Sequence, residues 1–205
     1  MKTEKKILSK EVISWAFYDW ANSAFATTVI AGFFPIFFKS FWANSLSDTE
    51  STALLGLANS LSGFFILIFA PFLGALADIT FRKKYMLVFF MLIGAGSTAS
   101  FFFIYEGYWT IAVIAYILAS IGFSGGNIFY DSLIIDVSND QSRNQVSAFG
   151  YAMGYLGGGI LFVVNVLMYL QPNIFGLASE IDAVLFSFLS VAIWWSIFTL
   201  SLIHI

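Results

Sequence analysis

The apolar positions of this chain fall in long uninterrupted runs, and most charged positions lie in the short segments between those runs. A transmembrane helix needs about 20 mostly apolar residues to cross a hydrocarbon core about 30 Å thick. Cutting the sequence at its charged residues leaves six long runs, and only residues 144–179 could hold more than one span. The end of that run contains turn-forming residues, which predict a loop there: Gln171, Pro172, Asn173 and Gly176. The pattern therefore predicts six transmembrane helices, at about residues 14–38, 53–77, 85–105, 109–135, 145–170 and 183–203.

The composition favours the same class of protein. The chain has 205 residues, of which 60% are hydrophobic and 10% are charged, whereas a soluble domain usually carries about 25% charged residues. We therefore expect an all-α integral membrane protein, with residues 1–205 forming a single six-span domain in the lipid bilayer. The absence of cysteine excludes disulfides and thiolate metal sites, and His204 is the single histidine. We expect no metal site and no cofactor.

Lysine and arginine are distributed unevenly between the two sides of the predicted bundle. If the helices alternate in direction, one side carries eight of the nine basic residues, namely Lys2, Lys5, Lys6, Lys10, Arg82, Lys83, Lys84 and Arg143. Only Lys39 falls on the other side. Because cytoplasmic segments are enriched in lysine and arginine, we predict a cytoplasmic amino terminus. The expected location is the cell membrane, or the vacuolar membrane in a eukaryote.

Polar residues inside two predicted helices are candidates for binding a substrate or a coupling ion. Asp19 and Asn22 share one face of the first helix, and Asn127 and Asp131 share one face of the fourth, because residues three or four apart are neighbours on a helix. Ionisable groups in a bilayer are costly, so those that remain are functional candidates. If the two helices are neighbours, Asp19 and Asp131 line one cavity. The alternative is that both carboxylates lie at the membrane interface, solvated by headgroups and water.

The second helix ends in Gly74 and Asp78 and is followed by Arg82 and Lys83. The basic residues alone could serve as a positive-inside anchor. That alternative does not explain a glycine and an aspartate one turn apart. Gly74 would allow another helix to approach, and Asp78 is placed to pair with Arg82 or to cap a neighbouring helix. We predict that these four residues form a cytoplasmic gating motif that holds one conformation closed.

The fifth helix contains a cluster of glycines: Gly150, Gly154, Gly157, Gly158 and Gly159. The spacing of four residues from Gly150 to Gly154 to Gly158 forms a face on which a partner helix can pack at backbone contact distance. Each glycine costs a helix roughly 1 kcal/mol relative to alanine, so we predict a helix that bends or slides. Close packing without movement is the alternative.

Motifs of soluble enzymes are absent from the sequence, including the Walker A motif, the Rossmann glycine fingerprint and the zinc-binding HExxH motif. The basic residues lie where membrane surfaces are expected, which disfavours a nucleic-acid partner. We therefore expect a protein that is not an enzyme and does not bind nucleic acid.

Several stretches resemble the major facilitator superfamily of transporters. Gly74-Ala-Leu-Ala-Asp78 followed by Arg82-Lys83-Lys84 is similar to the superfamily's cytoplasmic loop motif, with Phe81 in place of the usual glycine. Residues 14–23, 149–159 and 191–195 resemble the branch of vacuolar, autophagy-related amino-acid effluxers and their bacterial relatives. The resemblance covers nearly the whole chain.

This resemblance implies a proton- or ion-coupled secondary transporter that works by alternating access, with its small-molecule solute bound between two six-helix halves. Helices one and four line the central cavity in that fold, and they carry Asp19, Asn22, Asn127 and Asp131 here. Yeast relatives imply efflux of neutral amino acids. The fourth helix lacks the arginine of many proton-coupled members, so the acidic pair would have to serve in coupling.

The family's working unit has twelve spans, whereas this chain is predicted to have six. We therefore expect a partner, either a second six-span half or another copy of the chain, and assign the chain to the amino-terminal half of the fold. The alternative is a truncated, non-transporting membrane protein or a scaffold that needs a partner chain. An intramembrane enzyme is a third alternative, disfavoured because no nucleophile and base constellation is visible.

Overall fold

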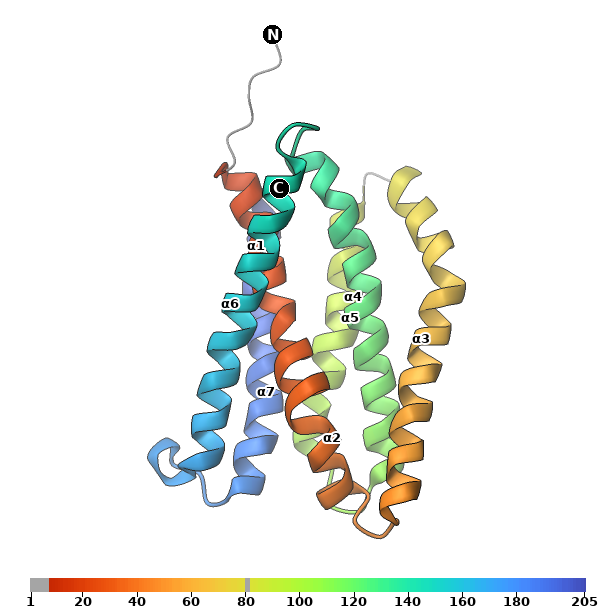
Figure 1. The fold of residues 1–205 in the computed structure, drawn as a ribbon, viewed down its shortest axis with the longest axis vertical. Helices are drawn as coiled ribbons and strands as arrows, with labels where there is room; N and C mark the ends of the chain where they lie inside the picture. Colours follow the sequence, from red (N-terminus) through yellow and green to blue (C-terminus); the bar gives the residue numbers. More distant parts are fainter. Residues whose placement is uncertain (1–7, 80–81) are drawn as a thin grey trace.

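The computed structural model describes residues 8–79 and 82–205, and the described chain is an antiparallel bundle of membrane-spanning helices (Figure 1). Six of its helical segments are long and apolar enough to cross a membrane. The α-helices are α1 (Lys10–Ala24), α2 (Phe34–Phe37), α3 (Asp48–Ile79), α4 (Lys83–Ser100), α5 (Trp109–Val137), α6 (Arg143–Leu170) and α7 (Glu180–Thr199). The predicted all-α, six-span class is confirmed. Phe81 and the basic residues Lys2, Lys5 and Lys6 lie outside the described residues.

The helices pack in an order that places α1 and α5 centrally. The first span packs along α6 and α7, α4 lies against α5 and α7, and α3 packs on α5. The starts of α1, α4 and α6 lie at one end of the bundle, so Lys10, Lys83 and Arg143 share that end. We call it the basic end. Most of α3 faces outward, and its span is the least buried.

Helix ends are fixed by local chemistry. The hydroxyl of Ser9 caps α1 by accepting a hydrogen bond from the backbone N–H of Val12 at 3.3 Å. Ser179 caps α7 in the same way, with the N–H of Asp182 at 3.1 Å. These caps satisfy backbone donors that a helix start leaves without an intrahelical partner. Between α6 and α7, Gly176 adopts φ 72°, a left-handed conformation that glycine tolerates best.

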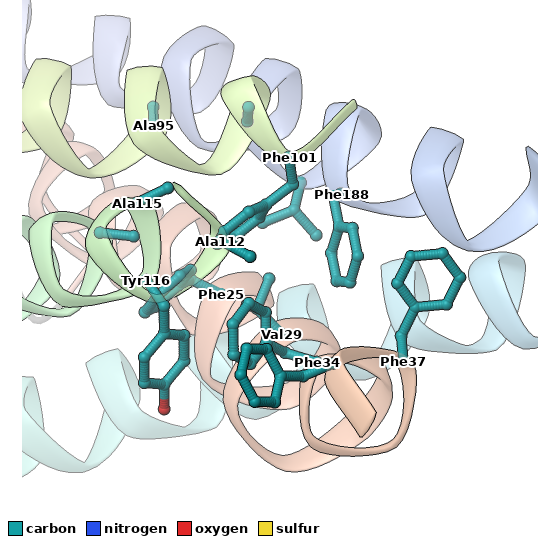
Figure 2. Close-up of a cluster of buried hydrophobic side chains, with 14 of the residues drawn as sticks. Phe25, Val29, Phe34, Phe37, Ala95, Phe101, Ala112, Ala115, Tyr116 and Phe188 are labelled. Atoms are coloured by element: carbon teal, nitrogen blue, oxygen red, sulfur yellow. The ribbon is translucent and has the colours of Figure 1, made fainter. Parts of the chain in front are cut away.

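The core at the end opposite the basic end is built from aromatic rings. Phe34 stacks on Tyr116 with ring centroids 4.2 Å apart and also contacts Phe101 at 5.1 Å, and Phe188 closes the cluster from α7 (Figure 2). Such ring pairs each contribute about 0.5–1.5 kcal/mol beyond area burial. The indole N–H of Trp42 donates to the backbone oxygen of Ile104 at 3.1 Å, which ties the first span to the α4–α5 connection.

The first span is not a uniform α-helix. It widens to a π-helix at η1 (Phe25–Phe33), passes through the short α2, and widens again at η2 (Phe38–Trp42). Pro35 lacks a backbone N–H and so cannot supply the regular i to i−4 bond there. At the end of η1 the N–H of Phe34 donates to the oxygen of Val29, a five-residue step. Because π-helical segments occur frequently at functional sites, this departure bears on the first span's role.

Close packing of α4 against α5 depends on glycine. A Cβ atom at Gly122 on α5 would collide with the backbone nitrogen of Gly94 on α4. Since helices in a bilayer associate largely through van der Waals packing, this approach at backbone distance holds the pair together.

Candidate functional site

A cavity of about 210 Å³ opens between α1, α5 and α6 in the half of the bundle nearer the basic end. It is lined by polar and aromatic side chains together with one aliphatic residue, namely Trp15, Asp19, Asn127, Tyr130, Asp131, Ile134, Ser147 and Tyr151. The structure therefore brings three of the four predicted solute or ion residues to one place, because α1 and α5 are neighbours.

Asn22, the fourth predicted residue, lies beside the cavity and does not line it. Its side chain is 1% exposed, and its Nδ2 donates a hydrogen bond to Oδ1 of Asn127. This bond joins two residues 105 positions apart in the sequence and restrains the orientation of the Asn127 amide. Asn22 is therefore placed to position Asn127, while direct contact between Asn22 and a solute has no support from this geometry.

An aromatic pair forms one wall of the cavity. The rings of Trp15 and Tyr130 are stacked, with centroids 4.4 Å apart and an interplanar angle of 8°. The indole N–H of Trp15 also donates to the backbone oxygen of Tyr130 at 3.0 Å. Two independent contacts thus fix the indole, so this wall is rigid before any solute arrives.

Glycines on α6 make room for the side chains that α1 sends toward the cavity. An added Cβ at Gly150 would lie 2.8 Å from the Tyr130 hydroxyl, and one at Gly154 would lie 2.7 Å from Oδ2 of Asp19. Both distances are too short for real side chains, so larger residues would displace the wall or the carboxylate.

The neighbouring glycines hold the backbones of α1 and α6 together. A Cβ at Gly157 would collide with the backbone oxygen of Trp20, and one at Gly158 would lie 2.9 Å from the backbone oxygen of Ser23. Gly159 has open space around its Cβ position in the described chain and takes no part in this contact. The helix packed on the glycine face is therefore α1 of the same chain.

The predicted gating motif lies at the basic end, around a second cavity of about 400 Å³ lined by Asp78, Lys83 and Asp136 among others. Nζ of Lys83 lies 2.9 Å from Oδ2 of Asp136 and 3.3 Å from the backbone oxygen of Ser132. Lys83 therefore links the start of α4 to the end of α5. Around Gly74, the described residues leave open space at the Cβ position, so no helix of the described chain approaches it.

Three contributors to these sites were not found from the sequence. Ser147 and Tyr151 line the first cavity from α6, and the signal available was their spacing of four residues, with Gly150 between them. Asp136 was not predicted as a contributor, because nothing in its local sequence identifies Lys83 as its partner.

Six helical segments of the described chain that are long and apolar enough to cross a membrane place this chain in the class of polytopic α-helical membrane proteins. The family described as Vacuole effluxer Atg22 like matches residues 42–136 and 135–205. The chain belongs to this family, a branch of the major facilitator superfamily.

Two curated relatives match most of the chain. An uncharacterized MFS-type transporter, YxiO of Bacillus subtilis (strain 168), is 38% identical over 200 residues, which is 97% of this chain and 47% of the relative. An uncharacterized protein of Aquifex aeolicus (strain VF5) is 24% identical over 182 residues, covering 88% of this chain and 45% of the relative. The chain thus spans about half the length of the curated relatives it matches. No solved structure matches it.

Proposed function

We propose that this chain is the amino-terminal half of a transporter that carries a small polar solute across a membrane by alternating access. The observation that carries the proposal is the convergence of Asp19, Asn127 and Asp131 on one cavity within a membrane-spanning bundle of this family. Carboxylates in a bilayer are costly unless they face a cavity or a partner, and they mark solute or ion pathways in such proteins.

The proposed transporter requires a second six-span half. Transporters of this kind hold their solute near the midplane between two structural repeats that rock about it. The curated relatives are about twice as long as the part matched here, which supports pairing with a second six-span half; a second copy of this chain is the other arrangement. The exposed face of α3 is one surface available to that partner.

The proposal extends to the solute, the coupling and the orientation. The family's description names vacuole effluxers, which supports efflux as the direction, and the sequence resemblance to amino-acid effluxers leads us to propose an amino acid as the solute. Asp19 and Asp131 are proposed to bind the solute or a coupling proton or ion. The shared end of Lys10, Lys83 and Arg143 supports a cytoplasmic amino terminus, in the cell membrane or, in a eukaryote, the vacuolar membrane. We propose no enzymatic activity.

Movement is proposed to involve two features. The Lys83–Asp136 ion pair, together with Gly74, Asp78 and Arg82, would hold the basic end in one conformation. The glycine-rich face of α6 would let α1 shift along it, because the glycines themselves carry no side chains that could block such a movement.

The test is uptake and efflux of radiolabelled amino acids in proteoliposomes that contain the chain with its co-purified membrane partner. We expect Asp131→Asn to lower transport by roughly tenfold or more, as loss of a charged contact of about 1.5–3 kcal/mol predicts, without lowering membrane abundance. Asp140→Asn is the matched control, because its side chain is 92% exposed and lies outside the cavity. Unchanged transport in Asp131→Asn would remove the assigned role, and no transport by any preparation would favour a scaffold.

A further inference from the structure

The charged side chains that line the cavity between α1, α5 and α6 are all acidic. Asp19 and Asp131 both line it, and its lining among the described residues includes no lysine, arginine or histidine. Asp19 is partly buried, whereas Asp131 is exposed, and a carboxylate that loses contact with water is stabilised by pairing, hydrogen bonding or protonation. The hydroxyl of Ser23 donates to Oδ1 of Asp19 at 3.2 Å, which is a neutral contact and leaves the charge uncompensated. The site therefore favours a positively charged occupant.

The residues that line the cavity favour an organic cation over a divalent metal ion. A divalent metal takes several oxygen ligands, and the described residues contain no group of three or more acidic or histidine side chains able to hold one. Trp15 and Tyr130 instead present two fixed, stacked aromatic rings beside the carboxylates. Aromatic rings attract ammonium groups within about 6 Å of the ring centroid, most strongly when the site is dehydrated. This combination suits an organic ammonium ion better than a hydrated metal.

The hydroxyl of Tyr130 is one of seven buried polar side-chain atoms of the described residues without a hydrogen-bond partner, and the one among them that belongs to a residue lining this cavity. Tyr130 is 6% exposed, and its hydroxyl has no hydrogen-bond partner within residues 8–79 and 82–205. Buried polar atoms are nearly always hydrogen-bonded, so an exception needs an explanation. Tyr130 lines the cavity, and its hydroxyl packs against Gly150, where a Cβ would lie 2.8 Å away. A ligand N–H group in the cavity would satisfy the oxygen.

We propose that the cavity binds a small organic ammonium ion, with Asp19 and Asp131 as its counter-ions, the Trp15–Tyr130 stack as its aromatic wall and the Tyr130 hydroxyl as a hydrogen-bond acceptor. This inference rests on the proposed function, because it takes the cavity as the solute site. The volume of about 210 Å³ limits the ligand to roughly one ring or a short chain, since pockets for drug-sized molecules measure about 300–1,000 Å³.

The test is binding of three probes of similar shape and different charge to the purified chain in lipid nanodiscs. The probes are phenethylammonium, 2-phenylethanol and 3-phenylpropanoate, with binding followed by calorimetry and by tryptophan fluorescence. We expect phenethylammonium to bind roughly tenfold or more tightly than the alcohol, as a charge-assisted contact predicts, and the anion to bind most weakly. Asp19→Asn and Asp131→Asn should each remove most of that preference, while Asp140→Asn should keep it.

Further variants separate charge recognition from folding. Asp131→Glu retains the charge and should retain most of the preference, and Tyr130→Phe retains the ring and should weaken phenethylammonium binding several-fold through loss of the acceptor. Equal binding of the anion, or a cation preference that survives both aspartate substitutions, would overturn the inference. If the anion or the alcohol binds and Ser147→Phe blocks it, the cavity remains a solute site and the transporter proposal stands. If none of the probes binds, the ammonium assignment is wrong, whereas the transporter proposal is decided separately by the amino-acid flux assay.

Discussion

The side chain of Asn22 on α1 donates a hydrogen bond to the side chain of Asn127 on α5, a residue that lines the acidic cavity. Asn22 is almost completely buried, whereas Asn127 lines the cavity. The bond therefore couples the packing of the two central helices to the orientation of a group that a solute can contact. A change at Asn22 is transmitted to the cavity without any direct contact between Asn22 and the solute.

The Asn22–Asn127 bond predicts non-additive effects. Asn22→Leu leaves the Asn127 amide without its partner, and Asn127→Leu leaves a buried amide on α1, so each should destabilise the protein. Interhelical hydrogen bonds in membranes average about 0.6 kcal/mol and reach about 1.7 kcal/mol, so a double-mutant cycle should show coupling in this range. The measurement is reversible unfolding in detergent micelles, with Asn59→Leu on the outer span as a variant outside the pair. Additive single effects would contradict a direct bond.

The glycine face of α6 predicts graded effects of side-chain size. Gly154→Ala places a Cβ 2.7 Å from the Asp19 carboxylate, so the carboxylate or the helix must shift. We expect a loss of stability of about 1–3 kcal/mol, typical of overpacking, together with weakened solute binding, and a larger loss for Gly154→Leu. Gly159→Ala is the matched control, because its Cβ would meet open space and alanine is the better helix former.

The readouts for these glycine variants are thermal unfolding of the purified protein and ligand binding by calorimetry. If Gly154→Ala and Gly159→Ala behave alike in both, the close contact between α1 and α6 does not control the cavity. If Gly154→Ala lowers stability but leaves binding unchanged, the glycine serves packing alone.

The sequence predicts the helices and part of the cavity for different physical reasons. The apolar runs predict the six spans because membrane thickness fixes their length. Asp19 and Asp131 stand out because a charge in lipid is costly. Ser147 and Tyr151 carry no such signal, since hydroxyl side chains are tolerated at many positions of a membrane helix, and only the packing of α6 on α1 brings them to the cavity.

The partners of individual residues were the least predictable feature. The ion pair that joins α4 to α5, Lys83–Asp136, spans 53 positions and was not predicted, while the expected role of Asp78 in pairing with Arg82 or capping a helix stays a prediction. The π-helical η1 was also not predicted. Local sequence restricts the candidates, and tertiary packing selects among them.

The Lys83–Asp136 pair predicts a charge-dependent change at the basic end. Asp136→Asn removes the ion pair, whose carboxylate is half exposed, so the cost in stability should be small, about 0.2–1 kcal/mol. The effect on gating should be larger, since the pair links two helices: we expect a faster flux and greater proteolytic access at the basic end. The reversed pair Lys83→Asp with Asp136→Lys should restore much of the original rate. No recovery in the reversed pair would show that the two residues act independently.

The absence of cysteine allows the orientation and the water access of the cavity to be tested by single-cysteine labelling. Ser147→Cys places a thiol of similar size in the lining of the acidic cavity, and Ser187→Cys places one in the fully buried interior of α7. We expect a charged, membrane-impermeant thiol reagent to modify Ser147→Cys from the cytoplasmic side only, because the cavity lies nearer the basic end. Ser187→Cys should remain unmodified until the protein is unfolded. Labelling of Ser147→Cys exclusively from the opposite side would reverse the proposed orientation, and equal reactivity of both thiols would show that the cavity is no more accessible to water than the core.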